Sequence, residues 1–295
     1  MFIGTLFILL NNKGVKPLVI IYFYVKIKIM NRDIKLIATD LDGTFLNNES
    51  EISSFNKEIF DYLANNGVEI VLSTGRPFEG MIRYKRHLNN KNNSIVLNGA
   101  IITDEGGKFI YDEPLDEKTA LKIMDIYEEY KKYNVFMHVY SGNKYVASEE
   151  DFYFRRYAQK EKLKEIFVGL HNIESFEFSK MLFIGDRDVL EKLQDEIRNS
   201  VKVHTSFSHT NFLEILRDGI NKGSALKWLC DKKGINRENV IAFGDNYNDI
   251  EMIEFAGVGV AMENGEEELK SKADYIALDN HSNGVGKFLK DFLKL

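Results

Sequence analysis

The sequence predicts an α/β protein in which a doubly wound, Rossmann-like parallel sheet is interrupted by an inserted α+β domain. Strand-like and helix-like segments alternate over residues 34–103, as they do where right-handed crossovers connect parallel strands. The pattern then changes to a mixture of short strands and helices, and the alternation resumes at residue 222. These observations indicate that one sheet is built from both ends of the sequence.

The net charge and the cysteine count exclude several kinds of partner and site. The 295-residue chain has a formal net charge of −6, so it offers no basic field for nucleic acid, and we expect no nucleic-acid partner. Cys230 is the only cysteine, which excludes an intrachain disulfide and a metal site built from cysteines. We interpret it as a buried structural thiol.

Residues 1–29 allow three interpretations. They contain two apolar runs, each shorter than the roughly 18–20 residues that a membrane helix requires, and they lack a clear secretory signal. Met30 opens a short polar lead into the first core strand, so an over-extended translation start is the first interpretation. A weak membrane tether is the second, and an additional strand over residues 19–28 is the third.

The first core strand lies within residues 34–46, IKLIATDLDGTFL, and ends in two carboxylates. Asp40 and Asp42 are two positions apart, so on a strand they point to the same side, and Gly43 allows the backbone to turn away. Carboxylates this close repel each other unless a cation lies between them or one is protonated. The stretch therefore suggests a metal site, acid–base chemistry or both, and an ordinary Asx turn after a strand is the alternative.

Two further strands of the same sheet also end in polar residues. The second strand runs into Ser-Thr-Gly-Arg at 73–76, and the third runs into Asn-Gly-Ala at 98–100. Chemistry collects at the carboxyl ends of parallel strands, so we expect both stretches to lie near Asp40. The elements predicted here are a helix over 52–65, a strand over 68–72, a helix over 78–88 and a strand over 94–97.

The next part of the chain departs from the alternating pattern. A strand at 101–103 and a hairpin turn at 105–107 lead into a mixture that is typical of an α+β domain. Its predicted helices cover 116–130, 152–163 and 189–199, and its predicted strands cover 135–140, 145–147, 180–185, 202–206 and 212–216.

The alternating pattern resumes in the last part of the chain. A helix begins at Lys222, and a buried strand over 240–243 runs into Gly-Asp-Asn-Tyr-Asn-Asp. That stretch places Asp245, Asn248 and Asp249 at the carboxyl end of its strand. The remaining predicted elements are helices over 222–233, 250–255, 266–272 and 285–293, and strands over 258–261 and 275–277.

Carboxylates, a hydroxyl and an ammonium at one sheet edge indicate phosphoryl chemistry. Three or more carboxylates without a neighbouring histidine or cysteine suit a hard cation such as Mg²⁺, which also binds phosphate. The Thr74 hydroxyl and the Lys222 ammonium are the donors that a phosphoryl group requires. A carboxylate can attack phosphorus to form an aspartyl-phosphate while a neighbouring acid protonates the leaving oxygen, and Asp40 and Asp42 could divide these tasks.

These residues also have ordinary structural interpretations. Thr74 could cap the following helix, Arg76 could form a surface ion pair, and Lys222 could be a solvated lysine. Asn98 with Gly99 is an ordinary turn signal. Their order along the chain favours a shared site over these separate roles. The six histidines show no metal-binding spacing, although one of them in the insertion could touch a substrate.

Four polar stretches, DLDGT, STGR, the lysine of INKGSAL and GDNYND, occur in this order. Together they resemble the four motifs of the haloacid dehalogenase (HAD) superfamily of phosphotransferases. The long insertion between STGR and the lysine is similar to the type IIB cap of Cof-type sugar-phosphate phosphatases. The resemblance extends from about residue 34 to the end of the sequence. We therefore expect a catalytic core over 30–111 and 218–295, with an inserted α+β cap over 112–217.

The resemblance implies a role for each residue of the reaction. Asp40 would be the nucleophile and a Mg²⁺ ligand. Asp42 would be the general acid and base, with its backbone carbonyl also on the metal. Thr74 and Lys222 would hold the phosphoryl oxygens, and Lys222 would also moderate the repulsion among the carboxylates.

The resemblance also implies the remaining metal ligands and the residues that face the substrate. Asp245 would bind Mg²⁺ directly, and Asp249 or Asn248 would complete or orient its shell. Arg76 and Asn98 would face the substrate together with Asn248.

We therefore expect a Mg²⁺-dependent phosphomonoester hydrolase that acts through an aspartyl-phosphate. Its substrate would be a small phosphorylated metabolite, such as a sugar phosphate or a phosphorylated cofactor precursor. A phosphomutase that uses the same intermediate and a non-catalytic sensor of phosphorylated ligands are the alternatives. We expect a cytoplasmic monomer or weak homo-oligomer without a membrane partner. Cap side chains would select the substrate, but the sequence does not single them out.

Overall fold

The computed structural model describes residues 33–142 and 144–295. Residues 34–295 form one compact unit. The three interpretations of residues 1–29 lie outside the described residues. Within the described ranges, no helix is both long enough and apolar enough to cross a membrane.

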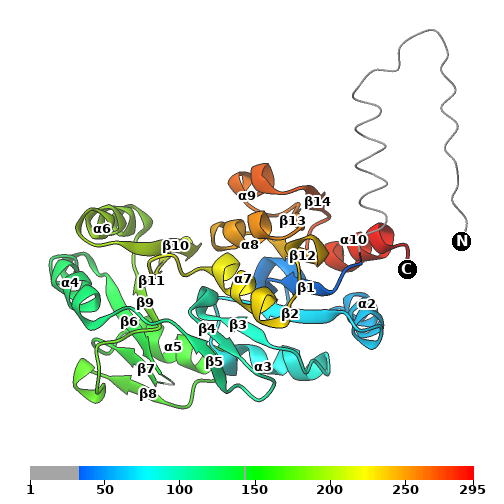
Figure 1. Ribbon diagram of the computed structural model, residues 1–295. Coiled ribbons are helices and arrows are strands. Elements are labelled where there is room, and N and C mark those ends of the chain that lie inside the picture. The colour runs from blue at the N-terminus through cyan, green and yellow to red at the C-terminus, as the bar shows by residue number, and fades with distance from the viewer. Residues whose placement is uncertain (1–32, 143) are drawn as a thin grey trace, which may run out of the picture. The chain divides into compact units, whose positions relative to one another are not determined.

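The first sheet has eight strands in the order β14-β13-β12-β1-β2-β3-β4-β5 (Figure 1). β1 pairs in parallel with β2 on one side and with β12 on the other, so that Leu36 lies opposite both Glu69 and Val240. This pairing confirms that distant parts of the sequence build one sheet. Its strands are β1 Leu36–Thr39, β2 Glu69–Ser73, β3 Ser94–Val96, β4 Ile101–Thr103, β5 Phe109–Asp112, β12 Val240–Gly244, β13 Val258–Met262 and β14 Tyr275–Ala277.

One edge of this sheet is antiparallel. β4 pairs with β3 and β5 in opposite directions, and β4 and β5 are joined by the hairpin turn that the sequence predicts. Asp104 closes that turn, because its side chain accepts hydrogen bonds from the backbone of Gly106 and Lys108. The sequence did not predict β5, a four-residue strand at the edge of the sheet whose residues are partly buried or exposed.

Helices cover both faces of the first sheet, as the doubly wound prediction requires. Alternate residues of β1 point to opposite faces, so Ile37 packs in one apolar cluster while Leu36 and Ala38 pack in another. Cys230 lies in the second cluster, where burial raises the pKa of its thiol to about 12. One face is covered by α2 Ser54–Asn65, α3 Phe78–His87 and α10 Gly284–Leu293, and the other by α7 Lys222–Lys233, α8 Ile250–Phe255 and α9 Glu267–Lys272.

The second sheet is formed by residues from the predicted cap. Its strands lie in the order β10-β11-β9-β6-β7-β8, and all pairs are antiparallel except β7 with β8. The strands are β6 Phe136–Ser141, β7 Lys144–Ala147, β8 Ile166–Val168, β9 Lys180–Ile184, β10 Val203–His209 and β11 Phe212–Arg217. The mixed composition confirms the α+β insertion, although the sequence did not predict the three-residue β8.

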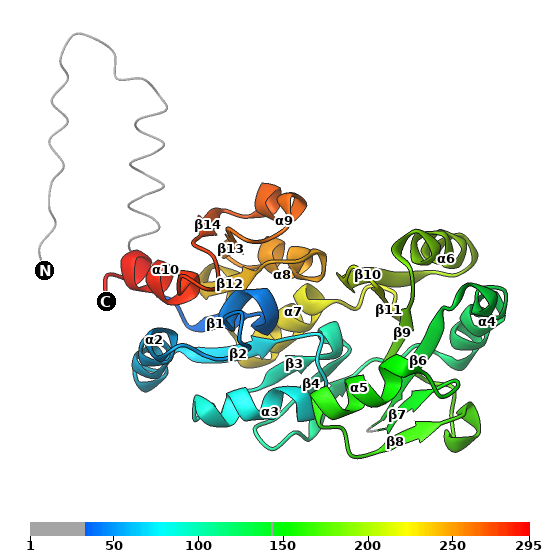
Figure 2. The ribbon, with the colours of Figure 1, turned by 180° about the vertical axis from the view of Figure 1, so that it is seen from behind.

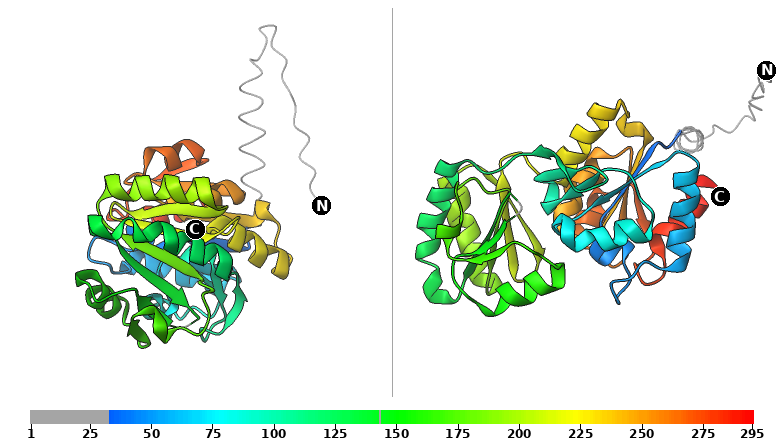
Figure 3. Two further views of the ribbon diagram at one scale, coloured as in Figure 1. Left: turned by 90° about the vertical axis from the view of Figure 1, so that its left-hand side faces the viewer. Right: turned by 90° about the horizontal axis from the view of Figure 1, so that it is seen from below.

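The helices of the cap divide between its two faces. α4 Glu117–Glu128 and α6 Arg187–Ser200 pack on one face with the cap's own apolar cluster. α5 Phe152–Glu161 packs on the opposite face, and its side chains Phe154 and Ala158 belong to the apolar cluster shared with the core. Figure 2 and the right-hand view of Figure 3 show α5 on the side of the cap sheet that faces the core.

Candidate active site

A buried lysine joins two carboxylates where β1 and β12 end. Asp40 follows β1 directly, Asp249 lies just beyond β12, and Lys222 is the first residue of α7. The Lys222 Nζ atom lies 2.6 Å from Asp40 Oδ1 and 2.6 Å from Asp249 Oδ1. All three side chains are buried. Because β1 and β12 are neighbours in the sheet, these residues meet although 182 positions separate Asp40 from Lys222.

Asp245 lies beside this group and is oriented by the turn after β1. The Thr44 hydroxyl donates a hydrogen bond of 2.5 Å to Asp245 Oδ1. Gly43 has a φ of +82°, and a Cβ atom at that position would overlap the Asp245 carboxylate. Glycine is therefore required here for both its left-handed backbone and its small size.

The acids at this site are crowded, which favours a bound cation. Burial raises the pKa of Asp40 to about 7 even though Lys222 opposes the shift. Burial raises the pKa of Asp245 well above its usual value, and the negative charges of Asp40 and Asp249 add smaller contributions in the same direction. One oxygen from each of the three acids lies within 4.8 Å of the others. Such an all-oxygen set fits a hard divalent cation, which would relieve the repulsion.

Asp42 pairs with Arg76 rather than with Lys222. The guanidinium donates from Nε to Asp42 Oδ2 at 2.6 Å and from Nη2 to Asp42 Oδ1 at 2.7 Å. Burial alone would raise the pKa of Asp42, but the bond to Arg76 and its charge lower the pKa overall. The Asp42 side chain remains 49% exposed, so it can still meet a ligand in the cavity. The two carboxylates of DLDGT thus occupy different environments.

Three polar residues predicted to be at the site lie together at the ends of β2, β3 and β12. The backbone N–H of Asn98 donates to the carbonyl of Thr74 at 3.0 Å. The Asn248 amide donates to Asn98 Oδ1 at 2.9 Å. Asn98 adopts a left-handed backbone with a φ of +56° and donates its own amide to Glu214 of the cap. Asn98 and Asn248 are therefore part of a network that extends into the cap.

The site opens into a cavity of about 310 Å³ between core and cap. Asp40, Asp42 and Thr74 contribute to its floor, whereas Lys222, Asp245 and Asp249 are not among the lining residues. The cavity is lined by core residues Asp40, Asp42, Thr74, Gly75, Arg76, Asn246 and Asn248, and by cap residues Tyr157, Lys160, Glu161, Ser208, His209, Phe212 and Glu214.

The sequence prediction missed the charged residues of the cap. Glu161, Lys180 and Glu214 are all buried, and each contacts a residue of the core. Lys180 donates to the carbonyl of Gly75 at 2.9 Å and lies 3.3 Å from Glu214. A signal was present, because Lys180 begins an otherwise apolar strand and Glu214 interrupts the apolar run of β11. Of the histidines, His209 lines the cavity and His138 is fully buried.

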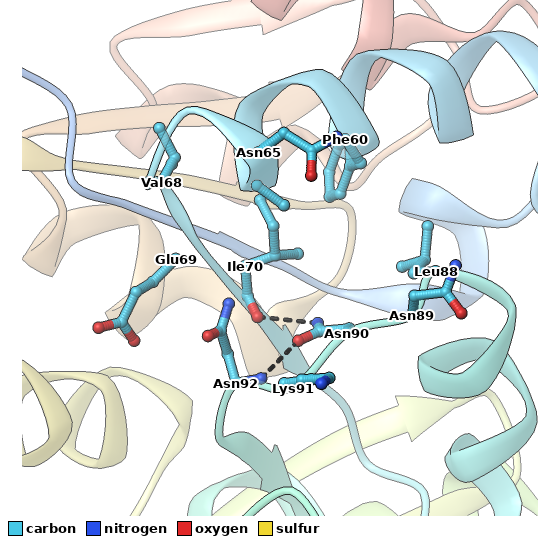
Figure 4. Close-up of a pocket in the computed structure, with 12 residues that line it drawn as sticks. Phe60, Asn65, Val68, Glu69, Ile70, Leu88, Asn89, Asn90, Lys91 and Asn92 are labelled. Atoms are coloured by element: carbon cyan, nitrogen blue, oxygen red, sulfur yellow. Dashed lines mark hydrogen bonds between the residues drawn. The ribbon is translucent and has the colours of Figure 1, made fainter.

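A second cavity of about 370 Å³ lies at the opposite end of β2 (Figure 4). Its wall combines apolar residues such as Phe60 and Ile70 with several asparagines, and Asn90 donates to the Ile70 carbonyl at 2.9 Å. Among the described residues that line it, Glu69 is the sole acid. This cavity therefore lacks the group of carboxylates that phosphoryl chemistry needs.

Comparisons with known proteins agree with this geometry. The model of the haloacid dehalogenase-like hydrolase family matches residues 37–289. Two 5-amino-6-(5-phospho-D-ribitylamino)uracil phosphatases of Bacillus subtilis are 30% and 32% identical to the chain, each match covering 88% of the chain and 98% and 96% of the relative.

Solved structures share the fold. A haloacid dehalogenase-like hydrolase from Bacteroides thetaiotaomicron is 32% identical, with a TM-score of 0.75, and the match covers 88% of this chain and 99% of that one. A subclass IIB sugar phosphatase is 22% identical with a TM-score of 0.76, covering 88% of this chain and 98% of that one. The second similarity is a likeness of fold, which includes both the core and the cap.

Proposed function

The chain belongs to the haloacid dehalogenase-like hydrolases, and we propose that it is a Mg²⁺-dependent phosphatase of small phosphorylated metabolites that works through an aspartyl-phosphate. The observation that carries this proposal is the position of Asp40. Its carboxylate is held by Lys222 at 2.6 Å at the floor of a cavity, with Asp42 two residues further on. A fixed carboxylate beside a second acid is the arrangement that nucleophilic attack on phosphorus requires.

The reaction divides between Asp40 and Asp42. Asp40 Oδ attacks phosphorus, the bond from phosphorus to the ester oxygen breaks, and that oxygen takes a proton from Asp42. Water then attacks the phosphorus of the aspartyl-phosphate and gives a proton to Asp42, which releases phosphate and restores both acids. The proton balance therefore closes over one turnover.

Mg²⁺ would be held by Asp40 and Asp245, together with the Asp42 backbone carbonyl. Asp249 would complete or orient this shell, since its oxygens already accept from Lys222 and from the backbone of Asp245. When bound, the cation would neutralise charge on the phosphoryl oxygens. Lys222 and Thr74 would donate to the same oxygens.

The cap would select the leaving group. Tyr157, His209 and Phe212 place rings at the cavity, while Ser208 and Glu214 place polar atoms there. A hydroxyl-bearing chain attached to a ring would use both kinds of surface. The substrate named for the two Bacillus relatives has this chemistry, so it is the first cofactor precursor to test beside sugar phosphates.

Phosphate release from a panel of phosphorylated metabolites tests this proposal. With Mg²⁺ present, we expect release from at least one sugar phosphate or cofactor precursor, and no release by an Asp40→Asn variant. Isomerised sugar phosphate without free phosphate would instead identify a phosphomutase. Binding of the panel without turnover would identify a sensor and refute the proposal.

A further inference from the structure

Arg76 lies between one carboxylate of the core and one carboxylate of the cap. One edge of its guanidinium holds Asp42 through two hydrogen bonds, as described above. Nη1 donates to Glu161 at 2.9 Å and 3.1 Å. Arg76 is itself buried. The planar guanidinium therefore fixes the two acids relative to each other, which a flexible ammonium could not do.

Glu161 is the last residue of α5 and is 2% exposed. Burial of a carboxylate is unfavourable unless a cation and hydrogen bonds compensate for the lost water. Arg76 supplies both, although it lies 85 residues away in the core. If the cap moved away from the core, this carboxylate and Arg76 would separate. The contact is thus specific to the closed arrangement of cap and core.

Gly80 gives independent support for this contact. It lies inside α3, where glycine weakens a helix relative to alanine. A Cβ atom at this position would overlap Glu161 Oε2. The glycine leaves space in the core helix that the cap carboxylate fills.

The other end of α5 is tied to the cap sheet. Asp151 caps the helix by accepting from the backbone of Tyr153 at 2.7 Å and Phe154 at 2.9 Å. The same carboxylate lies 2.7 Å from Nε2 of the fully buried His138 on β6. Because α5 is fixed at its start, Glu161 moves with the cap as a unit.

We propose that Glu161 is a positioning residue through which the closed cap holds Arg76, and thereby orients the Asp42 carboxylate at the cavity floor, where Asp42 would carry out the proton transfers of the proposed reaction. The inference rests on the proposed function, because it assigns a role within that reaction. Glu161 itself transfers no proton. It acts only through Arg76, and it does so only when cap and core are closed.

The dependence on the leaving group tests this role. An alkoxide must be protonated as it departs, whereas p-nitrophenolate leaves as a stable anion. We expect Glu161→Ala to lower kcat/KM for glucose 6-phosphate, or for the best alkyl phosphate of the panel, by about 10- to 100-fold. We expect kcat/KM for p-nitrophenyl phosphate to change by less than about threefold, and Glu161→Gln, which keeps one acceptor for Arg76, to lie between Glu161→Ala and wild type.

Two further variants separate this role from a general loss of structure. Gly80→Ala should reproduce the selective loss, because its methyl group displaces Glu161, and it should add little to Glu161→Ala. Glu165→Gln removes an exposed carboxylate four residues beyond Glu161 and should change neither rate. Equal losses on both substrates, or no loss on either, would overturn the proposal.

Hydrogen exchange tests the contact between Glu161 and Arg76 without requiring any catalytic turnover. Exchange should become faster in α5 and α3 of Glu161→Ala and in α5 of Gly80→Ala, but in neither helix of Glu165→Gln. Unchanged exchange in both helices would overturn the contact itself. An inactive wild type with this exchange pattern would refute the reaction and the role in proton donation, but not the closed contact.

Discussion

The core side of the cavity, its floor, is lined by polar residues from three short stretches of sequence. The cap side, its roof, is lined by residues from three separate elements. The floor comes from residues 40–42, 74–76 and 246–248, each at the carboxyl end of a strand. The roof comes from α5, β10 and β11. The residues proposed for chemistry therefore lie in short sequence motifs, whereas those proposed for substrate selection are brought together only by tertiary packing.

The largest expected effect comes from the floor. Asp40→Asn should lower phosphate release from every substrate by more than about 10⁴-fold, because it removes the proposed nucleophile. The amide can still accept the hydrogen bond from Lys222, and it relieves the repulsion with Asp249, so the fold should persist. Phosphate release and thermal unfolding of the same preparation check both points. Turnover within tenfold of wild type would contradict the assignment.

Two buried lysines lie outside the cavity lining, and one contacts an acid of the floor while the other contacts an acid of the roof, so they allow a matched comparison. Lys222 contacts Asp40 and Asp249, whereas Lys180 contacts Glu214 and the Gly75 carbonyl. Lys222→Met should abolish turnover of all substrates and destabilise the metal-free protein by roughly 3–5 kcal/mol, because it leaves two buried acids unpaired.

Lys180→Met should act differently. We expect it to retain turnover of p-nitrophenyl phosphate while it changes the order of preference among metabolites. A metabolite panel with both variants is the measurement. If the two lysine variants lost activity uniformly and to the same extent, floor and roof would not have separate tasks.

Glu214→Gln should have a smaller effect that is confined to the roof. The carboxylate accepts from Asn98, from Ser208 at 2.6 Å and from Lys180, and an amide can satisfy only part of this set. We expect kcat/KM for the preferred metabolite to fall about tenfold relative to p-nitrophenyl phosphate. A parallel fall for both substrates would show that Glu214 supports the fold of the site rather than substrate choice.

The smallest expected effect is a pH dependence of the stabilisation by Mg²⁺. Because the folded-state pKa of Asp40 is about 7, above its usual 3.8, its protonation stabilises the metal-free fold at low pH, and this stabilisation is lost as pH rises through about 7. Mg²⁺ binds the ionised form. The rise in Tm on adding Mg²⁺ should therefore be larger at pH 8 than at pH 6, and Asp40→Asn should flatten this difference. Equal shifts at both pH values in the wild type would contradict the Asp40 assignment.

Much of the core could be predicted from sequence because its signals are local. Two buried apolar runs that each lead into acidic residues predicted one sheet built from both ends of the sequence, and β1 pairs with β12 in that sheet. The strands β5 and β8 were missed because they are short and only partly buried. Their formation depends on pairing with β4 and β7 rather than on their own pattern.

The site divides in the same way. Sequence order brought Asp40, Lys222 and Asp249 into one prediction, and the structure places them in contact. Arg76 was expected to face the substrate. It lines the cavity, and no pattern in the sequence indicated that its guanidinium would also be shared between Asp42 and Glu161. No local pattern links Arg76 to a glutamate at the end of a cap helix, since that contact forms only when the two sheets come together.

The most direct measurement is the site of phosphoryl transfer. Wild-type protein and a slow Asp42→Asn variant would be mixed with an activated aryl phosphate and Mg²⁺, quenched in acid and digested for mass spectrometry. We expect one phosphoryl group on the peptide that contains Asp40, and none on the same peptide of Asp40→Asn. Phosphate release without that label, or a label on another residue, would contradict the proposal that the core carries the chemistry through Asp40.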